Sequence, residues 1–148
     1  MTAPSDEPLL DVSGLTTVFT LANGATAAAV NDVSFSVGRG ETVGLVGESG
    51  SGKSVTALSI IRLVQPPGRM TAGRIMFEGR DLATLDERAM RQVRGRRIGF
   101  VFQEPMIALN PVYTIGFQIR ETLEVHGLAR GAAARRRAVE MLDAVRVP

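Results

Sequence analysis

Residues 47–54 read Gly47-Glu48-Ser49-Gly50-Ser51-Gly52-Lys53-Ser54. This stretch matches the pattern G-x-x-x-x-G-K-S, which is typical of a loop that holds the phosphates of ATP or GTP. Glycines permit positive φ, so successive backbone N–H groups can turn toward one centre, and a following helix adds its unpaired N-terminal donors. Lys53 would reach the β- and γ-phosphates, and the Ser54 hydroxyl would bind Mg²⁺.

Lys53 is the only lysine in a chain of 148 residues, and every other basic residue except His126 is arginine. Lysine is thus kept at the one place where a compact ammonium would meet phosphate oxygens. Chance in a lysine-poor composition is the alternative, but it explains neither the glycines nor the flanking segments.

The segments on either side of this loop predict a strand, a loop and a helix in that order. Residues 41–46 are short and apolar and are expected to form a strand. Residues 54–63 place Leu58 and Ile61 on one apolar face, which predicts a helix that stops before Pro66-Pro67-Gly68.

The composition indicates a folded chain with a core of its own: 45% of residues are hydrophobic and the net charge is +2. The absence of cysteine excludes disulfides and thiolate metal sites. No apolar run exceeds four residues, and residues 1–8 are polar and acidic, so we expect a soluble chain without a secretory signal. Aromatic residues make up only 5%, and the arginine clusters at 94–97 and 135–137 are typical of solvated faces, so no nucleic-acid partner is expected.

An antiparallel layer is predicted near the N-terminus. Residues 9–20 and the alternating residues 33–37 read as strands, with a turn-like stretch of small residues at 24–29 between them. A further strand at 73–77 is closed by Glu78-Gly79.

The second half of the chain predicts helices around one buried strand. Thr84 and Glu87 form a capping-box pattern for a helix that runs to about Arg94 and ends at Gly95. Residues 98–102 are densely apolar, as in a buried parallel strand, and they place Gln103 at the carboxyl end, where ligands of open α/β sheets bind.

Two helices are expected at the end of the sequence. Thr114 would cap one that runs to about His126 and stops at Gly127. The other spans about residues 132–145, with an expected pair between Arg136 and Glu140. Its apolar face would consist of Ala138, Met141, Leu142 and Val145.

These separated features together resemble the nucleotide-binding domain of ABC transporters, and most closely the ATPase subunits of bacterial dipeptide and oligopeptide importers. The resemblance covers about residues 9–148. It rests on the strings at 33–41, 47–57, 73–82 and 100–111. Within the last string, Phe100-Val101-Phe102-Gln103-Glu104-Pro105-Met106 followed by Ala108-Leu109-Asn110-Pro111 resembles the Q-loop of peptide importers.

The resemblance implies an α/β fold of the P-loop NTPase (RecA-like) class. A parallel sheet core would carry an N-terminal antiparallel β layer and the start of a helical subdomain. Residues 1–8 would be a disordered N-terminus, 9–103 the N-terminal part of the ATPase core, and 104–148 a truncated helical subdomain.

The resemblance also implies roles for individual residues toward ATP and Mg²⁺. Phe19 would stack on adenine, the alternative being an ordinary strand residue that packs inward. Lys53 and Gln103 would be the catalytic residues, and Ser54 and Gln103 would bind the metal, with Gln103 also sensing the membrane partner. The nucleotide-binding set would be Phe19, Gly47, Glu48, Ser49, Gly50, Ser51, Gly52, Lys53, Ser54 and Val55.

The implied partners are transmembrane permease subunits and a second ATPase subunit, at the cytoplasmic face of the membrane. The segment Glu104–His126 would hold the permease's coupling helix; the alternative is a packed helical hairpin with no partner. Exposed apolar residues at Met106, Ile107 and Val112 favour the former. The family's catalytic histidine lies far downstream, so we interpret His126 as a helix C-terminal residue.

Several motifs of the family have no counterpart in this sequence. It contains no LSGGQ-like segment, no apolar strand ending in Asp-Glu and no switch histidine. The chain thus resembles the N-terminal half of an ATP-binding subunit that drives import of peptides or a related solute. The alternatives are an ATP-binding fragment without hydrolysis, a soluble ABC-type ATPase acting on nucleic acid, and an unrelated P-loop kinase or GTPase. Gln103 in its context argues against the last.

The 148 residues by themselves are expected to be marginally stable or prone to aggregate, because the resemblance implies that later strands would be needed to cover the apolar face of residues 98–102. A thermal melt of a monomeric preparation measures this. A sharp cooperative transition would contradict the expectation.

Overall fold

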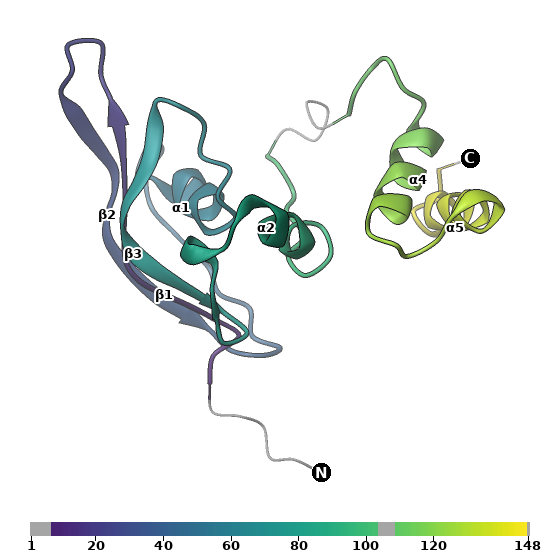
Figure 1. Cartoon of the computed structure of the whole chain (residues 1–148), viewed down its shortest axis with the longest axis horizontal. Helices are drawn as coiled ribbons and strands as arrows, with labels where there is room; N and C mark the ends of the chain where they lie inside the picture. The colour runs from purple at the N-terminus through teal and green to yellow at the C-terminus, as the bar shows by residue number, and fades with distance from the viewer. Residues whose placement is uncertain (1–6, 104–108, 148) are drawn as a thin grey trace. The chain divides into compact units, whose positions relative to one another are not determined.

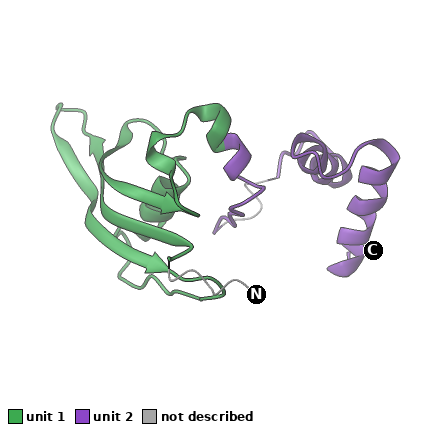
Figure 2. Cartoon of the chain, turned by 60° about the horizontal axis from the view of Figure 1, so that its bottom comes forward, with its two compact units in different colours: residues 1–90 green, residues 91–148 purple. Residues whose placement is uncertain are grey.

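The computed structural model describes residues 7–103 and 109–147. The chain divides into two compact units, Met1–Met90 and Arg91–Pro148 (Figure 2). The order of elements is shown in Figure 1. The predicted boundary after residue 103 separates an ATPase core from a helical subdomain, and that functional division stays a prediction.

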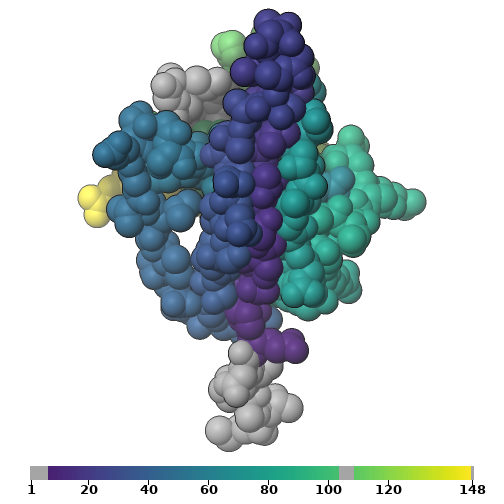
Figure 3. All heavy atoms as spheres, turned by 90° about the vertical axis from the view of Figure 1, so that its left-hand side faces the viewer, coloured from purple at the N-terminus to yellow at the C-terminus, as the bar shows by residue number. Residues whose placement is uncertain are grey.

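The first unit is built on a four-stranded antiparallel sheet with the order β2-β1-β3-β4. Its strands are β1 (Leu10–Thr20), β2 (Thr26–Val37), β3 (Gly68–Phe77) and β4 (Arg80–Asp81). Figure 3 shows β1 running between β2 and β3. The predicted antiparallel layer is therefore present, with β1 at its centre.

The stretch 24–29, predicted as a turn, is mostly strand. The turn ends by Gly24, at φ 81°, and β2 begins at Thr26, which pairs with Thr20. Pairing along the edge of β1 overrides the weak strand preference of the alanines. β3 likewise begins earlier than predicted, at Gly68, because Phe19 pairs with that residue.

The turn between β3 and β4 follows the prediction. Glu78 and Gly79 both have positive φ, 50° and 76°. Two central residues in the left-handed region are the signature of a two-residue hairpin turn whose twist matches that of the strands.

Helix α1 (Lys53–Ile60) contacts β1 and β2. It ends at Ile60, three residues before the predicted end at Leu63, because Arg62 adopts a left-handed φ of 55°. Its buried residues are Thr56 and Ser59, whereas Leu58 is only half-buried. The apolar core of this unit comprises Val12, Leu15, Val30, Ile61, Ile75, Phe77, Leu82 and Met90.

Two predicted strands are wrong. Residues 41–46 and 98–102 are in no strand, and Val46 and Val101 are 94% and 90% exposed. A parallel strand of a buried sheet needs neighbours that satisfy its backbone and cover both its faces. Within the described residues, the only parallel pairing is one isolated bridge between Arg94 and Ile98. Val101 and Phe102 are exposed, as expected for part of this apolar run, whereas Ile98 and Phe100 are half-buried.

The predicted capping box of the next helix is also wrong. Helix α2 spans Glu87–Val93, after a 3-10 turn η1 at Leu82–Thr84. The Ala89 amide donates to Asp86 Oδ1 at 2.7 Å, whereas the Thr84 hydroxyl donates back to the Asp81 carbonyl. Asp86 is one residue from the helix, so it reaches the first-turn amides and Thr84 does not. Gly95, at φ 76°, lies just beyond the helix end as predicted.

The second unit contains the helices α4 (Ile115–Val125) and α5 (Gly131–Ala144), which pack against each other. The Thr114 cap, the His126 C-cap and the positive φ of Gly127 confirm the predicted ends of α4.

Two details of α5 differ from the prediction. Glu140 pairs with Arg137 at 2.9 Å rather than with Arg136. Met141 and Val145 are exposed, so the buried face of α5 is narrower than predicted and consists of Ala134 and Ala138. None of the helices in the described ranges is long and apolar enough to cross a membrane.

The replacement Asp86→Ala is expected to lower the free energy of unfolding by about 1 kcal/mol and to speed hydrogen exchange of the α2 amides, because it removes the cap. Asp86→Asn keeps a side-chain oxygen at this position and should resemble the wild type. Faster exchange of α2 amides in Thr84→Ala, but not in Asp86→Ala, would restore the capping-box prediction.

Candidate nucleotide-binding site

The loop at residues 47–52 curls around the ammonium of Lys53. Lys53 Nζ donates to the carbonyls of Gly47 and Glu48, at 2.8 and 2.7 Å, and lies 3.3 Å from Ser51 Oγ. Gly50 and Gly52 make the turn possible, with φ of 81° and 89°. The single lysine of the chain is thus held at the centre of the loop, where the pattern predicts it.

The loop leads into a helix whose first turn has no side-chain cap. Gly52 is the N-cap of α1, and it has no side chain to occupy the first amide donors. The backbone N–H groups of that turn therefore remain open to an external anion, and the helix dipole favours negative charge there. Ser49, Gly50, Ser51 and Ser54 are exposed, so a ligand can reach the loop.

Gly52 also touches the antiparallel sheet. Thr17 pairs with Val30 and Val18 with Ala28, so Ala29 is an extra residue in β2 and forms a bulge. A Cβ on Gly52 would lie 2.1 Å from the Ala29 carbonyl oxygen. This position therefore requires glycine for two separate reasons, the φ angle and the close approach of β2.

Phe19 lies near the end of β1 and is half-buried. Its ring covers Gly68 on β3: a Cβ on Gly68 would come within 2.6 Å of Phe19 Cε1 and within 2.6 Å of Val64 Cγ1. The ring is thus supported on one side by the sheet. Its stacking on adenine stays a prediction, as does the inward-packing alternative.

Gln103 is exposed and lies in the second unit, at a bend that follows the unpaired residues 98–102. The loop, Lys53, Ser54, Val55 and Phe19 all belong to the first unit. Because the strand expected to carry Gln103 is not formed, the catalytic and metal-binding roles of Gln103 stay predictions.

Comparison with known proteins identifies the family. The family model described as ABC transporter matches residues 30–147, most of the chain and all of the phosphate-loop pattern. The chain belongs to the ABC transporter family. A relative from Brucella abortus (strain 2308), provisionally named a peptide import ATP-binding protein, is 54% identical over 150 residues. The match covers 97% of this ABC transporter chain and 44% of that relative.

Further similar proteins agree on the family. A relative from Brucella melitensis biotype 1, with the same provisional name, is 50% identical over 141 residues, which cover 95% of this chain and 42% of the relative. The chain thus spans less than half the length of these curated relatives. A dimeric ATP-binding cassette bound to ADP and phosphate matches with a TM-score of 0.77 at 27% identity, over 90% of this chain and 56% of that one. A dimeric bacterial ABC transporter cassette matches with a TM-score of 0.76 at 28% identity, over the same shares. These likenesses establish the P-loop NTPase class of this ABC transporter chain.

The second unit of the ABC transporter chain carries an exposed apolar surface. Hydrogen bonds from Gln118 fix the backbone at the start of this surface. The backbone N–H of Asn110 donates to Gln118 Oε1, and Gln118 Nε2 donates to the backbone carbonyls of Asn110 and Tyr113. Val112 is 82% exposed, as predicted, and Met106 and Ile107 lie outside the described residues. The exposed apolar side chains here are Leu109, Val112, Tyr113, Ile115 and Phe117.

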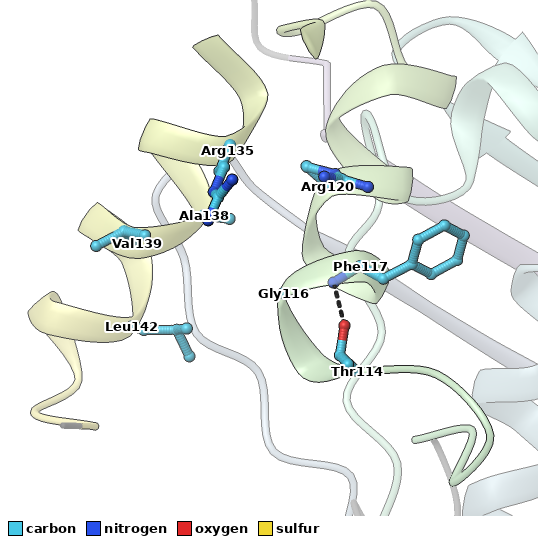
Figure 4. Close-up of a pocket in the computed structure, with 8 residues that line it drawn as sticks. All are labelled: Thr114, Gly116, Phe117, Arg120, Arg135, Ala138, Val139 and Leu142. Atoms are coloured by element: carbon cyan, nitrogen blue, oxygen red, sulfur yellow. Dashed lines mark hydrogen bonds between the residues drawn. The ribbon is translucent and has the colours of Figure 1, made fainter. Parts of the chain in front are cut away.

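A groove of about 360 Å³ runs between α4 and α5 (Figure 4). Thr114 caps α4 at its edge by accepting from the Phe117 amide at 3.2 Å, and Arg120 lies over the Phe117 ring, 5.9 Å from its centroid. Arg135, Ala138, Val139 and Leu142 line the opposite side.

Sequence reasoning missed two features of the candidate site. One is the bulge at Ala29. The other is a buried hydrogen bond between Thr17 Oγ1 on β1 and Ser59 Oγ on α1, at 2.8 Å. Each brings together residues that are far apart in the sequence: Ala29 contacts Gly52, and Thr17 contacts Ser59. Alanine, threonine and serine are too common in strands and helices to signal such contacts.

The variants Gly52→Ala and Gly50→Ala form a matched pair. Both place alanine at a positive φ, but a Cβ at Gly50 meets nothing within 4 Å. Gly52→Ala should therefore lower the free energy of unfolding by about 1–3 kcal/mol more than Gly50→Ala, because Ala29 must shift. Urea denaturation of both variants measures the difference. Equal losses would show that the contact with Ala29 does not constrain the loop.

Proposed function

We propose that this chain is the nucleotide-binding part of an ATP-binding subunit in an ABC importer. The observation that carries the proposal is the loop at residues 47–52, with the Lys53 ammonium at its centre and the uncapped N-terminus of α1 behind it. Fixed positive charge and open backbone donors around one point are what a triphosphate requires.

The ligand proposed for this loop is ATP with Mg²⁺. The chemistry of the donor set fits: lysine for the β- and γ-phosphates, backbone amides of residues 52–55 for the other phosphate oxygens, and the exposed Ser54 hydroxyl for the metal. A bound Mg²⁺ would neutralise phosphate charge. Phe19, which lies in the same unit and rests on Gly68, would supply the face on which adenine stacks. Gln103 would complete the metal site.

The proposed partners are membrane permease subunits and a second ATPase subunit, with the chain peripheral to the cytoplasmic face of the membrane. The relatives' provisional names support a peptide or a related solute as cargo. The dimeric cassettes among the solved structures support pairing of ATPase subunits. The exposed apolar side chains at 109–117 support permease docking on the segment 104–126.

A second candidate function is ATP binding without hydrolysis. The sequence contains no apolar strand ending in Asp-Glu, so a general base of the kind that the family uses is not among these residues. Phosphoryl transfer to water needs a positioned water, a metal and charge stabilisation together. Binding alone needs only the loop.

A pull-down with the tagged chain separates a transporter subunit from an ATPase that acts on nucleic acid. Capture of a membrane protein, rather than of DNA, would support the transporter assignment.

Binding of a fluorescent ATP analogue with Mg²⁺ to the 148-residue chain tests the proposed site. Lys53→Ala should weaken binding by about 10- to 100-fold, because charge-assisted hydrogen bonds to the phosphates are lost. Lys53→Arg should not restore it, since a planar guanidinium does not fit a cradle shaped around an ammonium.

Arg80→Ala is the matched control, because it removes one exposed positive charge from β4 in the same unit. Its affinity should stay close to that of the wild type. An affinity that falls equally in Lys53→Ala and Arg80→Ala would indicate general charge attraction, and unchanged affinity in Lys53→Ala would overturn the phosphate-loop assignment.

A further inference from the structure

The described residues contain three buried polar side chains, and all carry hydroxyls on or against α1: Thr17, Thr56 and Ser59. Thr56 bonds only within its own segment, to the Gly52 carbonyl at 3.0 Å. Thr17 and Ser59 are 42 positions apart in the sequence, and their hydrogen bond joins the central strand β1 to helix α1. Both elements are labelled in Figure 1.

The direction of this hydrogen bond follows from the protons available. Ser59 Oγ donates to the Val55 carbonyl at 2.7 Å, which uses its single proton. Thr17 must therefore donate to Ser59 Oγ. The Thr17 hydroxyl is therefore satisfied only when α1 holds Ser59 Oγ within its reach, so this bond constrains the rotation of α1 and its position along β1.

Thr17 is close to the residue proposed to stack on the base. It lies two positions before Phe19 on β1, and alternate residues of a strand share a face. No register shift separates Thr17 from Phe19 in the pairing of β1 with β3, where they face Met70 and Gly68. Ser59 lies on the helix that begins at Lys53.

A second contact fixes the other end of the helix. Gly52, at the N-terminus of α1, lies against the Ala29 bulge of β2. On the same strand, Ala27 pairs with Phe19. The two contacts together fix α1 at both ends against the two strands that carry and flank Phe19.

We propose that the Thr17–Ser59 hydrogen bond is a positioning contact for the nucleotide: it sets the distance between Phe19 and the phosphate loop, so that one nucleotide engages both. This inference rests on the proposed function. Thr17 and Ser59 are positioning residues, since neither is exposed to a ligand. Loss of the bond should leave Phe19 and the phosphate loop each intact but change the distance between them.

The test compares two ligands that differ in the base, Mg-ATP and Mg-tripolyphosphate, by titration calorimetry with the 148-residue chain. Thr17→Val keeps the shape of the side chain and removes the hydroxyl. It should weaken ATP binding by about 3- to 10-fold, the share that ring stacking supplies. Binding of tripolyphosphate should stay within about twofold of the wild type. Thr17→Ser, which keeps the hydroxyl, should restore the affinity for ATP.

Two further variants keep the test decisive. Ser59→Ala removes the acceptor from the other side and should show the same selective loss, so the proposal remains testable if Thr17→Val does not fold. In a Phe19→Leu background, Thr17→Val should have no additional effect on ATP binding, because the stacking that it disturbs is already gone. A purely stabilising role for Thr17 would not depend on the residue at position 19.

The outcomes separate this inference from the proposed function. Equal weakening for both ligands, no weakening for either, or full additivity with Phe19→Leu would overturn the positioning role while the wild type still binds both ligands. A wild type that binds neither ligand, with a folded circular dichroism spectrum, would overturn the proposed function and this inference with it.

Discussion

The arrangement of the first unit depends on the close contact between Gly52 and the backbone of β2. A phosphate loop could turn in many ways if only its glycines constrained it. Here the last glycine lies against the Ala29 bulge, where no other residue fits, and the helix that follows is tied to β1 by a hydroxyl pair. The antiparallel sheet therefore acts as the base on which the loop and α1 are mounted. The bulge residue thus presents its carbonyl to Gly52 at the end of the loop.

Unlike the loop and α1, the apolar segments at 41–46 and 98–102 are not held against the sheet by strand pairing. Their residues have the composition of buried strands, but in the described structure they pair with no other strand. Backbone amides in a parallel sheet are satisfied only by neighbouring strands, so apolar character alone cannot make a strand. The exposed Val46 and Val101 are the visible consequence. For the candidate site, this means that the loop owes its shape in this structure to the antiparallel layer rather than to a parallel strand before it.

The sequence predicted well wherever a structure depends on neighbouring residues. The loop at 47–54, the hairpin turn at Glu78-Gly79 and the two ends of α4 each rest on a local rule about glycine or a capping side chain, and each is found in the structure. Predictions failed where two local rules competed or where a partner segment was needed. Thr84 was predicted as the cap, and Asp86 takes that place because α2 begins only at Glu87. Arg136 was predicted as the partner of Glu140, and the pair that forms is instead with Arg137, three positions before Glu140 on α5.

By itself, the sequence determined the residue types of the loop at 47–54, the single lysine within it and the motifs that indicated the ABC transporter family. Spacing along the chain is sufficient to predict such features because the residue types that meet phosphate are neighbours in the sequence. Only the tertiary structure decided which surfaces constrain that loop. The contact of Gly52 with the Ala29 bulge and the Thr17–Ser59 hydrogen bond join residues that are more than 20 positions apart, and such contacts exist only once the strands and the helix have packed. Packing selects among many equivalent hydroxyls and alanines, and no local pattern in the chain marks the ones that it selects.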